Sequence, residues 1–418
     1  MQVLSKYAPP TVGRVSHIRA MSCAPTPHTH DGAFSVAPMM DYTDRFMRFM
    51  LRRLTARGTL YTEMVTANTI VHCGESELER FLSKEGIDGP NVFQVGGSDP
   101  ETLRKAAEII RPWGYDAINL NCGCPSDRVA GKGAFGAALM EEPDLVADCC
   151  AAIAEGSGLP VSVKCRIGVT RDRAQAAELE EEPVYDELSE FVRRVSERGG
   201  VRHFVVHARR AVLGGLSPDA NRKIPPLRPQ LVHRLADDFP ELRFSVNGGL
   251  EELDDLHGHL PHTSRLSGVM VGRAVMSRPW HWATVDTALY GAERDPAASR
   301  RQVLHEYIAF AEAQEAALPQ RIRRVLLSPV MNLFAGEPNG KKFRAAVDRR
   351  FKEDDASFGS LLLGAAEESL LPETLDAPPG AVWDRNSRCY VAAPHFDATA
   401  AAAVAEEQAE PMSAVGAS

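Results

Sequence analysis

Short apolar, β-branched runs recur along the middle of the chain, and each is followed by a polar loop and then by a longer stretch with helical periodicity. The helical stretches include Pro100–Ile110, which Asp99 can cap, Pro143–Ala154 and Tyr185–Glu197. Eight βα units in about 250 residues predict a (β/α)8 TIM barrel, with a doubly wound sheet as the alternative. The predicted strands are Phe34–Ala37, Thr59–Tyr61, Asn91–Val95, Ala117–Leu120, Val161–Cys165, His203–Val206, Arg243–Val246 and Gly268–Val271.

The pattern changes after Pro279, where helical periodicity takes over. We therefore expect a small all-helical domain after the barrel. In the last part of the chain, Pro378-Pro379-Gly380 and an alanine–glutamate run replace the periodicity. The expected organisation is an N-terminal extension (1–32), the barrel (33–285), the helical domain (295–355) and an acidic, alanine-rich, loosely ordered tail (356–418).

The first 30 residues contain three basic and no acidic side chains. This composition resembles a transit segment for a plastid or mitochondrion, and an ordinary disordered N-terminus in a cytoplasmic protein is the alternative. No run of about 18 apolar residues is present, so a membrane span is not expected.

Composition narrows the class of protein further. In a chain of 418 residues, hydrophobic residues make up 44% and charged residues 25%, which is typical of a soluble globular protein. The eight cysteines are scattered without a CxxC pair or a Cys/His ligand spacing, which indicates a reducing compartment and no metal site. We expect a monomer.

Charge is distributed unevenly along the chain. The net charge of −9 argues against a nucleic-acid partner, yet residues 320–352 carry nine basic side chains against two acidic ones. This basic stretch is either a solvated helix face or a phosphate-binding surface.

Chemically unusual residues follow the predicted strands, at the carboxyl ends where a barrel of this kind builds its active site. Each residue alone is weak evidence, and their joint placement carries the prediction. In chain order they are Pro38, Met39, Met40, Glu63, Gln94, Asn121, Cys124, Lys164, Arg166, His207, Asn247, Gly248, Gly249, Gly272 and Arg273.

The last two turns, Asn247-Gly248-Gly249 and Gly272-Arg273, offer free backbone N–H groups beside a guanidinium. Barrels commonly bind a phosphate at this position, although glycine also suits an ordinary tight turn. Gln94 and Lys164 could hydrogen-bond a flat, reducible ring that gains negative charge on reduction. Flavin mononucleotide (FMN) fits these demands.

Cys124 stands between a glycine and a proline in the loop after the fourth strand. A thiol with a pKa near about 8.5 is mostly protonated at neutral pH and can act as a general acid. The alternative is a buried structural cysteine, which is our expectation for Cys122. A Cys122/Cys124 disulfide is not expected, because one intervening residue strains its geometry.

Several of these segments together resemble the tRNA-dihydrouridine synthases, most closely their A subfamily. The resemblance covers about residues 34–350, and the downstream stretch Gly215–Leu227 is specific to the family. The matching motifs are Val36-Ala37-Pro38-Met39-Met40-Asp41-Tyr42-Thr43-Asp44, Phe93-Gln94-Val95-Gly96-Gly97, Leu120-Asn121-Cys122-Gly123-Cys124-Pro125-Ser126, Val163-Lys164-Cys165-Arg166-Ile167-Gly168, His207-Ala208-Arg209 and Asn247-Gly248-Gly249.

The resemblance implies a flavoenzyme that reduces the C5–C6 double bond of uridine in the tRNA D-loop, at position 20 with 20a as a second site. NADPH would reduce FMN, the hydride would pass to C6, and Cys124 would protonate C5. Asn121 and Arg166 would face the uracil. The residues implied to hold FMN are Pro38, Met39, Met40, Gln94, Lys164, His207, Asn247, Gly248, Gly249, Gly272 and Arg273.

A uracil within folded RNA must leave its stack to reach a flavin, which requires a cationic surface that holds the backbone around it. This requirement favours phosphate contact by the basic stretch. The residues expected to contact tRNA are Arg209, Arg222, Lys341, Lys342 and Arg344.

The chain departs from the family pattern in places. The loop after Cys124 is one residue longer than in bacterial members, Gly340-Lys341-Lys342-Phe343-Arg344 replaces a Trp-Arg-Arg run, and Ala174–Pro183 is a Glu-rich insertion expected to form a loop or helix start. Two other functions stay open: an FMN barrel oxidoreductase acting on a free pyrimidine or other small substrate, and an RNA-binding protein that has lost catalysis.

Overall fold

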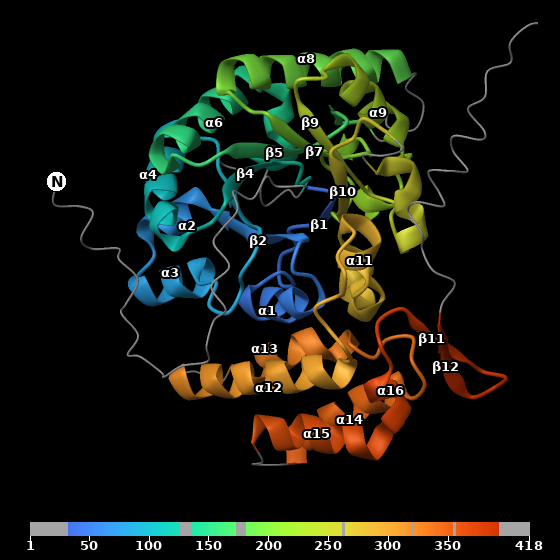
Figure 1. The fold of residues 1–418 in the computed structure, drawn as a ribbon. Coiled ribbons are helices and arrows are strands. Elements are labelled where there is room, and N and C mark those ends of the chain that lie inside the picture. Colours follow the sequence, from blue (N-terminus) through green and yellow to red (C-terminus); the bar gives the residue numbers. More distant parts are fainter. Residues whose placement is uncertain are drawn as a thin grey trace, which may run out of the picture. The chain divides into compact units, whose positions relative to one another are not determined.

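The eight predicted strands form a closed parallel barrel with the order β1-β10-β9-β7-β5-β4-β3-β2. The structure, a computed structural model, describes residues 32–125, 135–172, 181–260, 264–318, 322–353 and 357–392 (Figure 1). The barrel prediction is therefore confirmed, and the doubly wound alternative is wrong. The strands are β1 (Phe34–Val36), β2 (Thr59–Thr66), β3 (Asn91–Gly96), β4 (Ala117–Cys122), β5 (Val161–Arg166), β7 (His203–His207), β9 (Arg243–Asn247) and β10 (Gly268–Val271).

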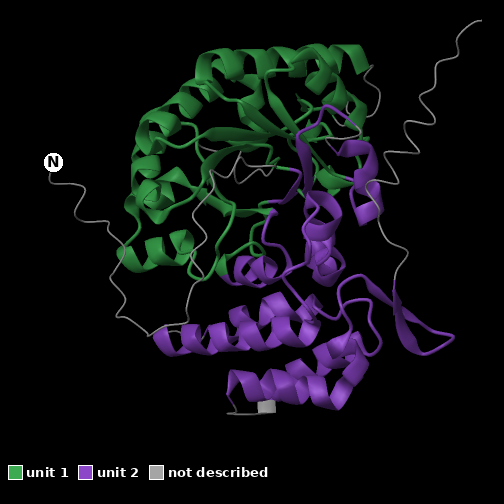
Figure 2. Cartoon of the chain, in the orientation of Figure 1, with its two compact units in different colours: residues 1–32, 38–45, 59–248 green, residues 33–37, 46–58, 249–418 purple. Residues whose placement is uncertain are grey.

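The chain divides into two compact units (Figure 2). In the described part, the first unit contains residues 32, 38–45 and 59–248, and the second contains residues 33–37, 46–58 and those from 249 onwards. The first unit holds β2 to β9, and the second holds β1, β10 and the C-terminal helices.

In the first unit, helices follow one another along the outside of the strands (Figure 1). Helix α4 begins where predicted, because Asp99 accepts a hydrogen bond from the Thr102 N–H at 2.8 Å and a proline occupies the first turn. The other predicted helices lie within α6 and α8. The elements of this unit are α2 (Ala67–His72), α3 (Glu75–Leu82), α4 (Pro100–Ile110), α6 (Pro143–Ser157), α8 (Glu181–Gly199), α9 (Pro229–Asp238) and a short sheet of β6 (Val169–Thr170) with β8 (Ala211–Val212).

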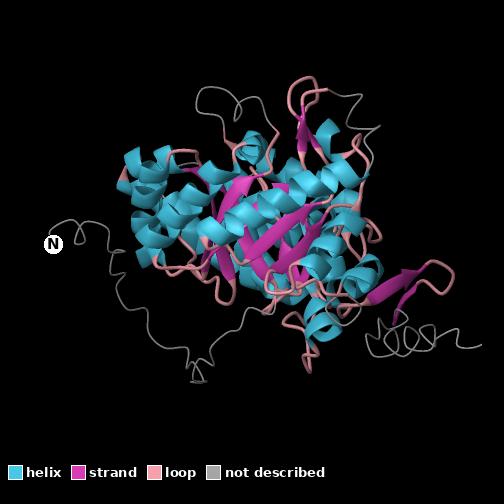
Figure 3. Cartoon of the chain, turned by 90° about the horizontal axis from the view of Figure 1, so that it is seen from above, coloured by secondary structure: helices cyan, strands magenta, loops and turns pink. Residues whose placement is uncertain are grey.

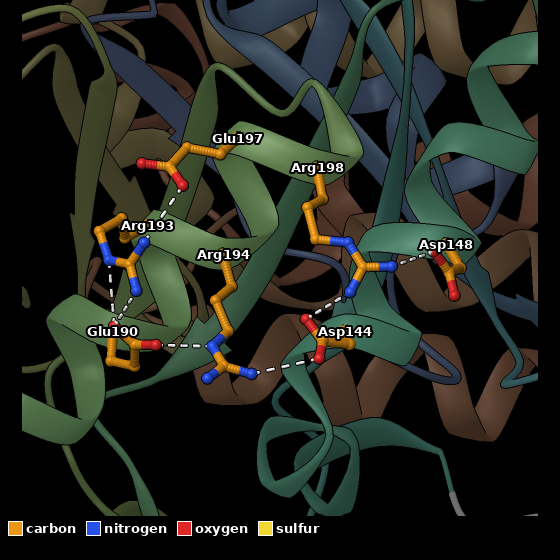
Figure 4. A network of polar contacts seen from close by, with 7 residues as sticks. All are labelled: Asp144, Asp148, Glu190, Arg193, Arg194, Glu197 and Arg198. Atoms are coloured by element: carbon orange, nitrogen blue, oxygen red, sulfur yellow. Dashed lines mark hydrogen bonds and ion pairs between the residues drawn. The ribbon is translucent and has the colours of Figure 1, made fainter.

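Helices α6 and α8 are joined by a surface network of ion pairs (Figure 4). Arg194 contacts Glu190 at 2.6 Å and Asp144 at 3.1 Å, and Arg198 contacts Asp144 at 2.7 Å. Such half-exposed pairs stabilise by about 0–1 kcal/mol each. Close packing matters more here, since a Cβ at Gly199 would lie 2.9 Å from the Cα of Ala147.

The second unit contains the helices that follow the barrel, so this segment is helical as predicted, and its helices continue to Asp376, beyond the predicted end at residue 355. Residues of α1 pack against α12 through an aromatic cluster, in which the rings of Phe49 and Phe310 stack with centroids 3.7 Å apart. The helices of this unit are α1 (Arg45–Leu54), which begins at the last residue of the other unit, α10 (Arg273–Ser277), α11 (Val285–Tyr290), α12 (Arg300–Ala317), α13 (Arg323–Leu327), α14 (Gly340–Glu353), α15 (Phe358–Ser369) and α16 (Pro372–Asp376).

The prediction of a loosely ordered tail from residue 356 is wrong for residues 357–392. This segment forms α15 and α16 (Figure 1) and an antiparallel hairpin of β11 (Ala381–Asp384) and β12 (Cys389–Ala392), whose strands are magenta in Figure 3. The reason is a short apolar face, Phe358, Leu361, Leu362 and Ala365, which α15 buries completely.

Other expectations fall on residues outside the described ranges. They are the N-terminal extension up to residue 31, most of the Glu-rich insertion (174–180), the end of the Cys124 loop (126–134) and the tail after residue 392. Residues 181–183 of the insertion begin α8. Within the described ranges, no helix combines the length and the apolar character needed to cross a membrane.

Candidate active site

The carboxyl ends of five neighbouring strands in the first unit carry the predicted polar side chains. The parallel register places Asn121 beside Lys164, Arg166 beside His207, and His207 beside Asn247. Because neighbours in register point to the same side of a sheet, the register gathers these side chains at one edge.

Cys124 lies on a turn that is held from two sides. The Oδ1 of Asn121 accepts hydrogen bonds from the backbone N–H groups of Gly123 at 3.1 Å and Cys124 at 3.0 Å. On the other side, the Nε of Arg166 donates to the Gly123 carbonyl at 3.2 Å. The thiol therefore stands on a fixed backbone within the electrostatic range of Lys164 and Arg166.

Lys164 is a half-buried cation at the end of β5. Its Nζ donates to the Oδ1 of Asn247 at 2.9 Å. Burial, and then the nearby Arg166 guanidinium, lower the pKa of Lys164 to about 8. The ammonium is therefore charged at neutral pH and loses its proton in mildly alkaline solution.

Gln94 is fully buried, and its amide is engaged at both ends. Its Nε2 donates to the Oδ1 of Asn119 at 2.7 Å, and its Oε1 accepts from the Nδ2 of Asn121 at 2.9 Å. Asn119 was not among the predicted site residues. Its signal in the sequence is a polar residue inside the apolar strand Ala117–Cys122, where a buried polar group needs a partner.

A cluster of arginines extends the positive charge near Cys124. The Nη1 of Arg166 donates to the Asn221 carbonyl at 3.0 Å, and Arg209 donates to the Pro225 carbonyl. Burial, and then the nearby Arg222, lower the pKa of Arg166 to about 10. The structure thus places Arg166, Arg209 and Arg222 near one another.

The turn after β9 requires glycine. Gly248 has a φ of 104° and Gly249 a φ of 79°, which side chains rarely adopt. A Cβ at Gly248 would also lie 2.9 Å from the Nε2 of His207. The turn therefore takes glycine both for its backbone conformation and because the His207 ring lies against it.

The remaining predicted residues lie in different places. Pro38, Met39 and Met40 belong to the first unit, and Met40 is exposed. Gly249, Gly272 and Arg273 belong to the second unit, where Arg273 begins α10.

Lys341, Lys342 and Arg344 lie in the first turns of α14, also in the second unit. Within the described ranges they form no ion pair, and cations at a helix N-terminus are disfavoured by the helix dipole unless an anion binds there. Other cations of the basic stretch are paired: Arg323 with Glu315, and Arg349 and Arg350 with Glu368. The free positive charge is therefore smaller than the sequence count.

Cysteines and acids give no sign of a metal centre in the parts of the chain that are described, where no three potential ligands come together. Cys122 is completely buried, and burial raises its pKa. This agrees with a structural cysteine at that position.

A parallel barrel with polar side chains, a thiol and a glycine turn at the carboxyl ends of its strands has the active-site arrangement of a barrel enzyme. The family model described as dihydrouridine synthase matches residues 35–369. The chain belongs to the dihydrouridine synthase family.

Curated relatives share this family's name. Proteins named tRNA-dihydrouridine(20/20a) synthase are 43% identical over 321 residues in Vibrio parahaemolyticus (76% of this chain and 91% of the relative) and 41% identical over 345 residues in Synechocystis (82% and 93%). The Escherichia coli protein of the same name is 41% identical over 316 residues (75% and 85%). A solved 2-naphthoyl-CoA reductase complex has a TM-score of 0.43 and 10% identity over 60% of this chain and 49% of its own, too little for an inference about function.

Proposed function

We propose that this protein reduces the C5–C6 double bond of uridine in the D-loop of tRNA to 5,6-dihydrouridine, at position 20 or 20a. The observation that carries the proposal is Cys124, fixed by Asn121 and Arg166 within a chain of the dihydrouridine synthase family. Membership of that family argues against the alternative of a free-pyrimidine oxidoreductase.

Enzymes of this family are flavin-dependent, and the site's residues suit FMN. Gln94, Lys164, His207 and Asn247 supply amide, amine and imidazole groups at the strand ends, next to the glycine turn of Gly248 and Gly249. Pro38, Met39 and Met40 would line the ring, and Gly249, Gly272 and Arg273 would bind the phosphate. When bound and reduced by NADPH, FMN supplies the hydride for C6 of the uracil.

The protein's own residues supply the other half of the reduction. The Cys124 thiol donates its proton to C5 as C6 gains the hydride, so the double bond takes up one hydride and one proton. The resulting thiolate is stabilised by the charges of Lys164 and Arg166. Asn121 and Arg166 hold the uracil.

The uracil reaches this site only when its nucleotide is turned out of the tRNA fold. Arg209 and Arg222 beside the site, and Lys341, Lys342 and Arg344 on α14, would contact the surrounding phosphates.

Replacement of the thiol tests the assignment directly. We expect Cys124→Ala to purify with bound flavin and to lose roughly 100-fold or more in the rate of dihydrouridine formation in tRNA. Cys73→Ala is the matched control, since Cys73 is a free, partly buried cysteine on another loop. Full activity of Cys124→Ala, measured as dihydrouridine per tRNA by mass spectrometry, would show that another group protonates C5.

A further inference from the structure

A continuous line of hydrogen-bonded side chains crosses the first unit's part of the barrel interior and ends at the Cys124 turn. Its first step is at Ser162, whose Oγ accepts from the Nδ2 of Asn119 at 2.9 Å. From Asn119 the line continues through Gln94 to Asn121, with bonds of 2.7 and 2.9 Å. We call these four residues, Ser162, Asn119, Gln94 and Asn121, the amide ladder.

The ladder has a fixed direction because its last step is made by backbone donors. The N–H groups of Gly123 and Cys124 can only donate, so the Asn121 oxygen must face them. The Asn121 NH2 then faces Gln94, whose oxygen must accept. The Gln94 NH2 therefore faces Asn119, whose oxygen must accept in turn.

This direction determines what Asn121 offers to a ligand. Its oxygen already accepts two N–H groups, so only a remaining N–H of its amide is available. The charged neighbour Arg166, which is also proposed to hold the uracil, is a donor only. Such a group of donors suits the C4 carbonyl of uracil and repels the C4 amino group of cytosine.

We propose that Asn119 is a positioning residue, which fixes the orientation of the Gln94 and Asn121 amides and thereby the Cys124 turn and the selection of uracil over cytosine. This inference rests on the proposed function for its substrate. Asn119 itself lies one layer below the site, bonded to Gln94 and Ser162, and acts through them.

Hydrogen exchange of the Gly123 and Cys124 amides tests the positioning role without turnover. In flavin-free protein, Asn119→Leu should speed their exchange roughly tenfold, since the ladder loses its middle link. Asn119→Asp keeps an acceptor for Gln94, and the Ser162 hydroxyl can rotate to donate, so exchange should stay near that of the unchanged protein. Ser245→Ala is the control, because Ser245 is a buried barrel serine bonded to His203 at 2.9 Å and not to the ladder.

Kinetics provides the second readout. The substrates are tRNAs that carry uridine or cytidine at the target position. Asn119→Leu should lower kcat for the uridine tRNA about 10- to 100-fold and leave its KM unchanged. The ratio of kcat/KM for the uridine tRNA to that for the cytidine tRNA should fall. Asn119→Asp should keep both kcat and this ratio near the values of the unchanged protein.

The outcomes test the positioning role of Asn119 and the proposed function separately. If the unchanged protein reduces tRNA but Asn119→Leu behaves like Ser245→Ala in exchange and in preference, the ladder has no positioning role. If Asn119→Leu does not fold, Ser162→Ala takes its place and should show the same changes in smaller degree. If the unchanged protein fails to reduce tRNA, the proposed function is wrong whatever the exchange shows.

Discussion

Lys164 is a residue of the candidate site whose charge changes in mildly alkaline solution. Its pKa of about 8 lies below the usual 10.5, chiefly because of burial. Below pH 8 the ammonium is present, and in the proposed function it binds the electron-rich edge of the flavin. Above pH 8 the flavin-free protein must take up a proton to restore it.

We therefore expect the affinity of flavin-free protein for FMN to fall roughly fivefold between pH 8 and pH 9. Lys164→Arg keeps its charge over this range, so its affinity should stay nearly constant. Fluorescence titration with FMN at several pH values measures both. An equal slope in the two proteins would mean that Lys164 does not respond to pH at this site.

The same pKa has a consequence for folding. Between pH 8 and 10.5 the unfolded chain carries a proton on Lys164 that the folded chain lacks, so this residue makes the flavin-free protein more stable as the pH rises. Lys164→Met removes this part of the pH dependence. Urea unfolding at pH 8 and pH 10 gives the change in the free energy of unfolding for each protein. The same change in Lys164→Met and in the unchanged protein would contradict the lowered pKa.

The residues at the strand ends could be predicted from the sequence, because strand periodicity determines where each strand ends and the barrel brings those ends together. Gln94, Lys164 and Asn247 follow from this rule. Asn119 does not, since a polar residue within an apolar strand has no assigned partner until the register is known. The pairing of Arg349 with Glu368 likewise depends on the packing of α14 against α15.

At the scale of elements, the C-terminal hairpin is tied to the helices by a buried cation. Arg300 is completely buried, forms an ion pair with Glu337 and donates to the Thr374 carbonyl at 3.2 Å. The Tyr390 hydroxyl of β12 donates to Glu337 at 2.5 Å. Glu337 precedes α14, so the hairpin and the start of α14 share one carboxylate.

Removal of this carboxylate should be costly. We expect Glu337→Gln to lower the free energy of unfolding by about 3 kcal/mol, because it leaves the buried Arg300 charge without its partner. Asp376→Asn is the matched control, since Asp376 pairs with Arg301 on the surface and its loss should cost less than about 1 kcal/mol. An equal loss in the free energy of unfolding for the two variants, measured by urea unfolding, would mean that burial adds nothing to the contribution of the Arg300–Glu337 pair.

Elements with a complete local pattern were predictable to within a few residues, and the C-terminal hairpin was not. The helix Pro100–Ile110 has a cap, a proline and a full apolar face, and it forms with those bounds. Strand β11 has only four residues, and its pairing with β12 depends on contacts such as that of Tyr390 with Glu337. Local periodicity cannot show such contacts, so the hairpin was not predicted.

For the whole molecule, the net charge of −9 is opposed by local groups of cations. If the unpaired cations of α14 contact tRNA phosphates, tRNA binding should weaken steeply with salt. Replacing Lys341, Lys342 and Arg344 with Gln should reduce the slope of log affinity against log salt by about 2 to 3. Replacing the paired Arg349 and Arg350 with Gln should reduce this slope less. Filter binding at several salt concentrations measures the slopes, and a larger reduction in the Arg349 and Arg350 variant would contradict the prediction.

The central claim is that the barrel of this protein transfers reducing equivalents to uridine in tRNA. The most direct measurement is anaerobic: the bound flavin is reduced, tRNA that lacks dihydrouridine is added, and the return of the oxidised flavin spectrum is followed. The account predicts fast reoxidation by this tRNA and none by free uridine or by tRNA that already carries dihydrouridine. Reoxidation by free uridine alone, or a protein that binds no flavin, would contradict it.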